Sequence, residues 1–326
     1  MFDTQPPLIL IVDDEPANLA VMREVLGDKY QLVYAKNGAS ALAAAEKYNL
    51  SLILLDINLP DMDGYEICKQ LKGNPNTHQI PIIFVTAMNS NQDEEIGLKV
   101  GAVDYITKPF SPAIVLARVR IHLSLVKIEK LEASYREAIY MLGAAGHHND
   151  TDTGVHIWRM AAYAARLADE CGWGLKSKLL ELAAPMHDTG KIGIPDAILR
   201  KPASLTPDEW AIMKTHSQIG YDILSRGNSS VFKMAAEISL YHHEKWDGSG
   251  YPQGLSGEAI PESARIVAIA DVFDALTMDR PYKKAWSVEE AIAEIKKGSG
   301  KHFEPQLVNK FENILPDICN IKKQWG

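Results

Sequence analysis

Cysteine is scarce in this chain, and the few cysteines form no recognisable ligand pattern. Cys68, Cys171 and Cys319 are far apart, odd in number and form no Cys-x-x-Cys pair. A disulfide framework or a cysteine metal site is therefore not expected. The pattern favours a reducing compartment, with the three thiols as core side chains.

Long apolar runs and an excess of positive charge are also absent. No run approaches the roughly 18 apolar residues of a membrane-spanning helix. The opening MetPheAspThrGlnProPro lacks the basic and apolar regions of a signal peptide. We therefore expect a cytoplasmic protein without membrane insertion. The net charge of −8 argues against DNA as the default partner, but it permits a small anionic substrate where basic residues gather locally.

The length of 326 residues predicts two domains, and the hydrophobic pattern changes once along the chain. Residues 1–124 alternate short apolar runs with amphipathic stretches. Buried strands are predicted at 8–12, 52–55 and 82–85, and weaker strands at 31–35 and 104–106. This alternation predicts an α/β doubly wound parallel sheet of the flavodoxin-like kind. From residue 146 onward the pattern is helical throughout, which predicts an all-α second domain.

Charged residues follow several of the predicted strands. Asp13 and Asp14 follow the first strand, Asp56 the third and Lys108 the fifth. Parallel sheets bind ligands beyond the carboxyl ends of their strands, where these side chains would meet. One such acid is usually a solvated loop residue, but a set at matching strand ends predicts a site for one hard cation, best Mg²⁺. Asp56 would be a nucleophile, since a carboxylate can form an acyl phosphate.

Residues 5–124 resemble a response-regulator receiver domain. The matching segments are ValAspAspGlu at 12–15, AspIleAsnLeuProAspMetAspGly at 56–64, ThrAla at 86–87 and LysProPhe at 108–110. The resemblance implies that a sensor histidine kinase phosphorylates Asp56. It also implies the Mg²⁺ ligands Asp13, Asp14, Asp56 and the Asn58 carbonyl, the phosphate counter-charge Lys108 beside a cis Lys108–Pro109 bond, and the switch pair Thr86 and Tyr105.

One long helix is predicted between the two halves. Apolar residues recur every three or four positions from Ile121 to Leu142, and residues 113–145 contain no turn signal before Gly143. Residues 125–145 would be a linker helix between domains 1–124 and 146–326. The apolar stripe could form a short parallel coiled coil in a homodimer or pack on the chain's own domains. We favour the dimer, although the stripe drifts and is short for a heptad repeat.

Residue types that bind metals recur in order through the second half. The set is Asp152, His156, His187, Asp188, His216, His242, His243 and Asp271. Such a set makes sense if the fold gathers it around a metal centre, whereas His78, His122 and His302 are ordinary imidazoles. Mixed imidazole and carboxylate ligands suit first-row ions such as Fe, Mn, Co, Ni or Zn. Water activated by these ions would hydrolyse a substrate.

Helices are predicted to carry these residues, at 153–169, 179–186, 234–244 and 265–277. A capping box at Thr206–Glu209 begins a helix that would carry His216, and Ser287–Glu290 caps a later one. Adjacent helix residues point about 100° apart, so His187 and Asp188 cannot bind one ion in the same way. An Asp188 that bridges two ions fits a two-metal phosphodiester hydrolase.

Residues 146–315 resemble the HD-GYP domain, a branch of the HD phosphohydrolases. The matches are HisAspThrGlyLysIleGlyIleProAsp at 187–196, His242-His243-Glu244 with Asp247-Gly248 and Gly250-Tyr251-Pro252, AlaAspValPheAspAlaLeuThr at 270–277 and AspArgProTyrLys at 279–283. The resemblance implies hydrolysis of the bacterial messenger cyclic di-GMP to linear pGpG, GMP or both.

Residue roles follow from this resemblance. Two transition-metal ions, Fe or Mn first and Ni, Co or Zn as alternatives, would bind His156, His187, Asp188, His216, His242, His243 and Asp271. Lys191, Arg280 and Lys283 would hold phosphates. Lys191 could also protonate the leaving oxygen. Tyr251, in the glycine-rich loop beside the site, would contact the substrate, hold the loop or face a partner, and diguanylate-cyclase domains are candidate partners. Three-metal members of the family carry glutamate at the position of Asp152, and because aspartate is shorter we predict two ions.

The sequence therefore predicts a cyclic di-GMP phosphodiesterase controlled by phosphorylation of Asp56. Two alternatives remain open. The HD core would also permit hydrolysis of another linear or cyclic nucleotide, and the second half could be a signalling adaptor with little turnover. Degenerate ligands would favour the adaptor, but no core ligand is missing from the set.

Overall fold

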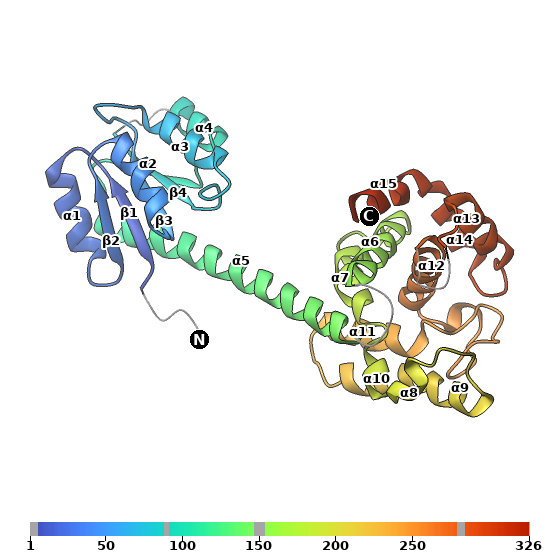
Figure 1. The fold of residues 1–326 in the computed structure, drawn as a ribbon. Coiled ribbons are helices and arrows are strands. Elements are labelled where there is room, and N and C mark those ends of the chain that lie inside the picture. Colours follow the sequence, from blue (N-terminus) through green and yellow to red (C-terminus); the bar gives the residue numbers. More distant parts are fainter. Residues whose placement is uncertain (1–5, 88–90, 147–153, 279–283, 326) are drawn as a thin grey trace. The chain divides into compact units, whose positions relative to one another are not determined.

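The computed structural model describes residues 6–87, 91–146, 154–278 and 284–325 (Figure 1). The chain divides into two compact units, Met1–Ala133 and Ser134–Gly326. Each unit has its own hydrophobic core, two layers in the first and one in the second.

A five-stranded parallel sheet in the order β2-β1-β3-β4-β5 forms the centre of the N-terminal unit. The strands are β1 (Leu8–Val12), β2 (Gln31–Ala35), β3 (Leu52–Asp56), β4 (Ile82–Thr86) and β5 (Asp104–Thr107). Each lies within one residue of its predicted bounds. The central strands β3 and β4 are buried along their whole length, which explains why their sequences are almost continuously apolar.

Helices pack on both faces of this sheet. Met22 of α1 (Pro16–Leu26) and Val115 of α5 (Pro112–Gly146) lie in one core, while Ala41 of α2 (Gly38–Lys47) and Ile67 of α3 (Gly64–Gly73) lie in the other. Successive strand residues point to opposite faces, so each strand contributes to both cores. Helix α4 (Asn91–Lys99) connects β4 to β5. The doubly wound fold predicted from the sequence is confirmed.

The long helix predicted over 113–145 is present as α5, one residue longer at each end. The boundary between the two units falls within it. At its C-terminal end, a Cβ built on Gly146 would lie 2.8 Å from Thr189 Cα and 3.2 Å from the Asp188 carbonyl oxygen. The end of α5 therefore lies backbone to backbone against the segment that carries Asp188.

Helices build the C-terminal unit, and its core is centred on Met160, Tyr163, Phe273 and Phe311. The larger helices are α6 (Gly154–Glu170), α7 (Leu175–Ala183), α9 (Pro207–Lys214), α10 (His216–Leu224), α11 (Ser230–Tyr241), α12 (Glu262–Thr277), α13 (Val288–Lys297), α14 (Pro305–Asn313) and α15 (Leu315–Trp325). The short α8 (Asp196–Leu199) lies between them in the chain. Both predicted capping boxes are present. No helix among the described residues is long and apolar enough to span a bilayer.

Three helices end before their predicted C-termini, and each early end places a candidate ligand at a helix terminus. The helix predicted over 179–186 ends as an α-helix at Ala183, because Pro185 has no N–H, and the 3-10 turn η1 (Ala184–Met186) continues to His187. The helix that begins at the Thr206 cap ends at Lys214. The N–H and hydroxyl of Thr215 both donate to the Ile212 carbonyl, which closes that helix before His216.

The third difference concerns the tandem histidines. The helix predicted over 234–244 is α11, which begins after the Ser229 cap and ends at Tyr241. His242 is its C-terminal cap, and the Glu244 N–H closes a tight turn onto the Tyr241 carbonyl at 2.9 Å. His243 therefore lies outside the helix, where the chain turns sharply.

Candidate metal centre and phosphorylation site

Three carboxylates meet at the carboxyl edge of the sheet. Ligand oxygens of Asp13, Asp14 and Asp56 all lie within 4.8 Å of one another. Asp13 and Asp56 are buried, while Asp14 is exposed. Hard oxygen donors in this arrangement fit Mg²⁺.

A lysine neutralises part of this charge. Lys108 Nζ lies 2.6 Å from Asp56 Oδ2 and 2.8 Å from Asp13 Oδ2. Burial raises the pKa of Asp56, and the hydrogen bond and charge of Lys108 only partly oppose that rise. Burial alone would lower the pKa of Lys108, but its bonds to both carboxylates raise it. The ammonium group therefore stays charged beside Asp56, where it would face a phosphoryl group.

The remaining predicted residues of this edge lie close by. The Asn58 N–H is 3.4 Å from Asp56 Oδ1, and Thr86 is buried at the end of β4. Tyr105 on β5 is half-buried, with the Arg118 guanidinium 5.6 Å from its ring centroid. The Lys108–Pro109 bond is cis, as predicted. Since Arg118 belongs to α5, the ring of Tyr105 is in contact with the base of the long helix.

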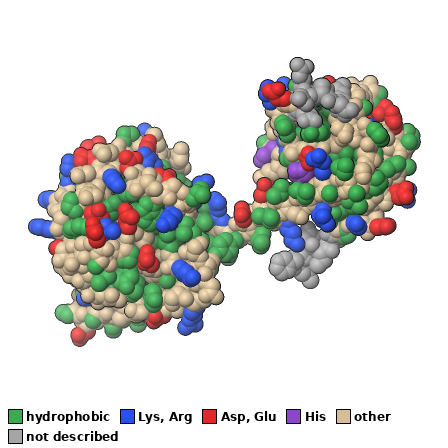
Figure 2. Space-filling view, turned by 180° about the vertical axis from the view of Figure 1, so that it is seen from behind, with side chains coloured by type: hydrophobic (Ala, Val, Ile, Leu, Met, Phe, Trp, Pro, Cys, Tyr) green, Lys and Arg blue, Asp and Glu red, His purple; other side chains and the backbone are tan. Residues whose placement is uncertain are grey.

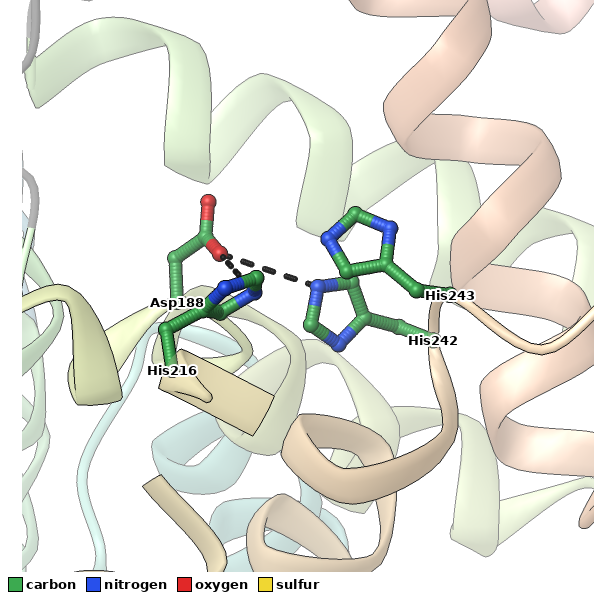
Figure 3. A group of neighbouring side chains, drawn as sticks. All are labelled: Asp188, His216, His242 and His243. Atoms are coloured by element: carbon green, nitrogen blue, oxygen red, sulfur yellow. Dashed lines mark ion pairs between the residues drawn. The ribbon is translucent and has the colours of Figure 1, made fainter. Parts of the chain in front are cut away.

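In the C-terminal unit, one carboxylate lies between two groups of histidines. Asp188 Oδ1 lies 3.3 Å from His216 Nε2 and 3.6 Å from His242 Nε2 (Figure 3). Asp188 Oδ2 lies 3.2 Å from His187 Nε2. His243 completes the first group, in which all four ligand atoms lie within 4.8 Å of one another. The two oxygens of Asp188 thus face different imidazoles.

A second acid completes the other group. Asp271 Oδ1 on α12 lies 3.8 Å from His156 Nε2 and 3.9 Å from His187 Nε2. The structure therefore brings together all seven core residues of the predicted ligand set that it describes. Asp152, Arg280 and Lys283 lie outside the described residues.

The elements that carry these ligands are held together by a close backbone approach. Gly190 lies in the 3-10 turn η2 (Thr189–Gly193), directly after Asp188. A Cβ on Gly190 would lie 1.9 Å from the His216 carbonyl oxygen. Only glycine allows this approach, and it places the Asp188 segment against the first turn of α10.

Each inner imidazole is oriented by its own backbone. His187 Nδ1 lies 2.9 Å from the Ala184 carbonyl, His216 Nδ1 lies 2.7 Å from that of Met213, and His242 Nδ1 lies 3.0 Å from that of Ile238. A carbonyl can only accept, so each Nδ1 carries the proton. Each Nε2 then points its remaining site at Asp188, which is how ligand histidines are usually held.

Two buried atoms in this centre have no conventional partner. Asp188 Oδ1 and His216 Nε2 face each other at 3.3 Å, yet neither makes a hydrogen bond within the described part of the chain. Burial lowers the pKa of His216 to about 4, so its Nε2 holds a lone pair at neutral pH. A lone pair that faces a carboxylate is repelled unless a cation lies between them. The donor set therefore fits a metal ion.

The pKa of His187, in the other group of imidazoles, shifts in the opposite direction from that of His216. Burial alone would lower the pKa of His187, but the charge and hydrogen bond of Asp188 raise it to about 9. The pKa of Asp188 itself is held well below its usual range, against the effect of burial, by Lys191 and His187. Lys191 Nζ lies 2.8 Å from Asp188 Oδ2. The Asp188 carboxylate is therefore ionised, as a bridge between two metal ions would require.

The ligand pattern did not reveal a buried pair behind His156. Asp274 is fully buried and accepts hydrogen bonds from Arg159 Nε at 2.6 Å and Nη2 at 2.8 Å. It also bonds His156 Nδ1, which leaves Nε2 toward Asp271. The signal was present, since Arg159 follows His156 by three residues and Asp274 follows Asp271 by three, so each second residue lies on the same helix face as a ligand.

Glu244 is the other functional side chain that residue types alone did not reveal. It is buried, and its carboxylate accepts the N–H groups of Gln253, Gly254 and Leu255 at 2.7, 3.1 and 3.0 Å. The bonds fix the loop that carries Tyr251, whose ring lies 4.7 Å from that of His243 at a 31° tilt. Tyr251 is thus positioned beside the histidine cluster.

Family models match both halves of the chain. One described as an HD domain matches residues 129–307, more than half of the chain, and one described as a response regulator receiver domain matches residues 9–120. This chain belongs to the HD-domain family. Its HD domain follows a receiver domain, as in a response regulator, and HD domains are metal-dependent hydrolases.

Curated relatives align with both domains. A probable cyclic di-GMP phosphodiesterase of Vibrio cholerae is 40% identical, and the alignment covers 100% of this chain and 82% of that protein. The cyclic di-GMP phosphodiesterase response regulator RpfG of Xanthomonas campestris is 37% identical, with 92% and 86% covered. A 3′3′-cGAMP-specific phosphodiesterase of V. cholerae is 36% identical, with 83% of this chain and 53% of that protein covered.

Proposed function

We propose that this protein hydrolyses cyclic di-GMP at a two-metal centre in the HD domain, under the control of phosphorylation at Asp56. The observation that carries the proposal is the buried Asp188 carboxylate, whose two oxygens face separate groups of imidazoles. Two relatives that align through both domains are named as cyclic di-GMP phosphodiesterases, which supports the choice of substrate.

The chain offers four ligands to each ion. Asp188 Oδ1 with His216, His242 and His243 would hold one ion, and Asp188 Oδ2 with His156, His187 and Asp271 the other. Fe and Mn suit this mixture of imidazole and carboxylate, with Ni, Co or Zn as alternatives. Bound ions would polarise a phosphodiester oxygen and lower the pKa of water for attack. We propose two ions, because Asp152 has a shorter side chain than the glutamate of three-metal relatives.

Basic side chains would neutralise the negative charge of the substrate phosphates. Lys191 lies on η2, close to the Asp188 carboxylate and only partly exposed. Its ammonium group can neutralise a bound phosphate and donate a proton to the oxygen that leaves when the P–O bond breaks. Arg280 and Lys283 are proposed to hold further phosphate oxygens.

The mixed cyclic dinucleotide 3′3′-cGAMP is the second candidate substrate, because one relative is named for it. Protein loaded anaerobically with Fe²⁺ or Mn²⁺ should be given each dinucleotide in turn, with products resolved by chromatography. We expect faster turnover of cyclic di-GMP, giving linear pGpG, GMP or both. Preference for 3′3′-cGAMP would overturn the substrate assignment, and no turnover of either by fully loaded protein would favour the adaptor.

Phosphorylation of the receiver domain can be tested with acetyl phosphate as donor and Mg²⁺ present. We expect the wild-type chain to accept a phosphoryl group on the buried Asp56 carboxylate, and Asp56→Asn to accept none. Asp28→Asn, a change at an exposed acid of the same domain, is the control and should react normally. Labelling of Asp56→Asn to the wild-type level would place the modification elsewhere. Acetyl phosphate should change phosphodiesterase activity in the wild type but not in Asp56→Asn.

Helix α5 presents a stripe of exposed hydrophobic side chains, some of which are visible in Figure 2. Ile114, Ile121 and Ile128 recur every seven residues, and Leu125 lies between the last two at the complementary heptad position. About half of the surface of each is exposed. We propose that a second copy of the chain covers this stripe in a parallel coiled-coil dimer.

Replacing Ile128 by lysine should weaken this dimer at least about tenfold, because two like charges would face each other at the helix seam. Sedimentation or light scattering over a concentration series would measure the change. Glu137→Lys is the matched control, since this exposed position lies on the opposite side of the heptad. A wild-type chain that is monomeric at high concentration, or an Ile128→Lys variant that dimerises as tightly as wild type, would contradict the proposal.

A further inference from the structure

An exposed tryptophan lies near the metal centre without any part in the ligand set. Trp210 on α9 keeps 47% of its surface exposed. Its ring lies edge-to-face with that of Tyr251, with centroids 6.4 Å apart. A large flat side chain that remains open to solvent in this position is available to a ligand.

A continuous series of rings connects Trp210 to the candidate ligands. The Tyr251 ring lies 4.7 Å from that of His243 and 6.4 Å from that of His216. Glu244 holds the loop that carries Tyr251 through three backbone hydrogen bonds, and the Tyr251 N–H donates to the His243 carbonyl at 3.2 Å. A nucleotide with its phosphate at the metal centre would therefore extend its base along aromatic surface.

A cation stands beside this surface. Lys214 Nζ lies 5.7 Å over the Tyr251 ring centroid, one helical turn beyond Trp210 on α9. A lysine donates hydrogen bonds and accepts none. Guanine presents two neighbouring acceptors, O6 and N7, whereas adenine presents an amino donor beside N7. Lys214 would therefore distinguish the two purines.

We infer that Trp210, Tyr251 and Lys214 form a base-binding subsite, in which a purine stacks on the aromatic side chains and Lys214 selects guanine over adenine. This inference rests on the proposed nucleotide phosphodiesterase function and deepens it. Trp210 would supply stacking surface, and Lys214 would supply a hydrogen-bond donor. Their position on α9 makes them specificity-determining residues, outside the metal ligands.

The subsite can be tested by calorimetric binding of GMP, AMP and ribose 5-phosphate to the full chain loaded with Mn²⁺. Ribose 5-phosphate carries the phosphate without a base. Trp210→Ala should weaken the affinity for GMP roughly five- to a hundredfold, which is the range for loss of one stacking partner. The affinity for ribose 5-phosphate should change by less than about twofold. Trp210→Phe should retain most of the affinity for GMP. Lys214→Met should lower the affinity for GMP to the level of the affinity for AMP, which should itself change little.

Trp325→Ala removes another exposed tryptophan of the same domain, on α15, and should change nothing. If Trp210→Ala weakens the binding of GMP and ribose 5-phosphate equally, or weakens the binding of neither, the proposed base-binding subsite is contradicted. The latter result would suit a protein partner on Trp210. A wild-type protein that binds GMP through Trp210 but turns over no cyclic dinucleotide would keep the subsite and overturn the proposed function alone.

Discussion

Replacement of Asp188 by asparagine is expected to reduce cyclic di-GMP hydrolysis by roughly a thousandfold or more. The substitution keeps the shape of the side chain but removes the charge that both groups of imidazoles face. Loss of several kcal/mol of transition-state charge stabilisation corresponds to about this factor, because each 1.36 kcal/mol changes a rate tenfold. Turnover under saturating Fe²⁺ or Mn²⁺ measures the effect, with metal content determined on the same samples.

The metal content shows whether activity is lost because metal is lost or because the bound metal no longer supports hydrolysis. We expect Asp188→Asn to bind less than its full complement of metal, since a neutral amide bridges two cations poorly. Asp222→Asn, at an exposed acid of the same domain that accepts a hydrogen bond from Gln218, is the control and should keep both metal and activity. An Asp188→Asn protein with undiminished hydrolysis would show that this carboxylate is not the bridge.

The second large effect is expected at Asp274, which touches no predicted ligand position except through His156. Asp274→Leu would leave the Arg159 guanidinium buried without its partner. Breaking a buried pair in this way costs about 3–5 kcal/mol of stability. The free energy of unfolding of the HD domain, measured in urea on metal-free protein, should fall by that amount. Asp317→Leu breaks the exposed Arg166 pair and should cost less than about 1 kcal/mol.

A double variant distinguishes stability from metal binding. Arg159→Met combined with Asp274→Leu removes both buried charges, and much of the lost stability should return. His156 still lacks the carboxylate that orients its ring, so metal affinity should stay about 10- to 100-fold below wild type in both variants. Competition with a chromophoric chelator would measure it. Recovery of metal affinity together with stability would show that Asp274 acts on the fold alone.

The sequence predicted the sheet well and the ends of the helices less well, for physical reasons. Strands buried on both faces appear as short apolar runs, which is why β3 and β4 were found within one residue. Helix ends depend on single hydrogen bonds that periodicity does not register. Pro185 lacks the N–H that a continuing helix needs, whereas Thr215 and Glu244 each donate an N–H that closes a turn. The continuous apolar pattern extends past all three.

The candidate site shows the same division. Imidazole and carboxylate side chains are rare enough as an ordered set that the ligands could be selected from their types. Asp274, Arg159 and Glu244 act by orienting a ligand or a loop. Residue type alone does not distinguish a buried acid that binds an arginine or backbone N–H groups from any other acid in the chain. The i,i+3 spacing of His156 to Arg159 and of Asp271 to Asp274 becomes informative only once His156 and Asp271 are taken as metal ligands.

The contact at Gly146 gives the end of α5 a direct mechanical role. Because no side chain separates Gly146 from the backbone of Asp188 and Thr189, displacement of this helix end cannot be absorbed by a change of rotamer. It must move the main chain that carries the shared carboxylate, and with it the spacing between the two groups of imidazoles. Movement of this helix end would therefore change the distances between the candidate metal ligands, so turnover should respond to it more strongly than substrate affinity.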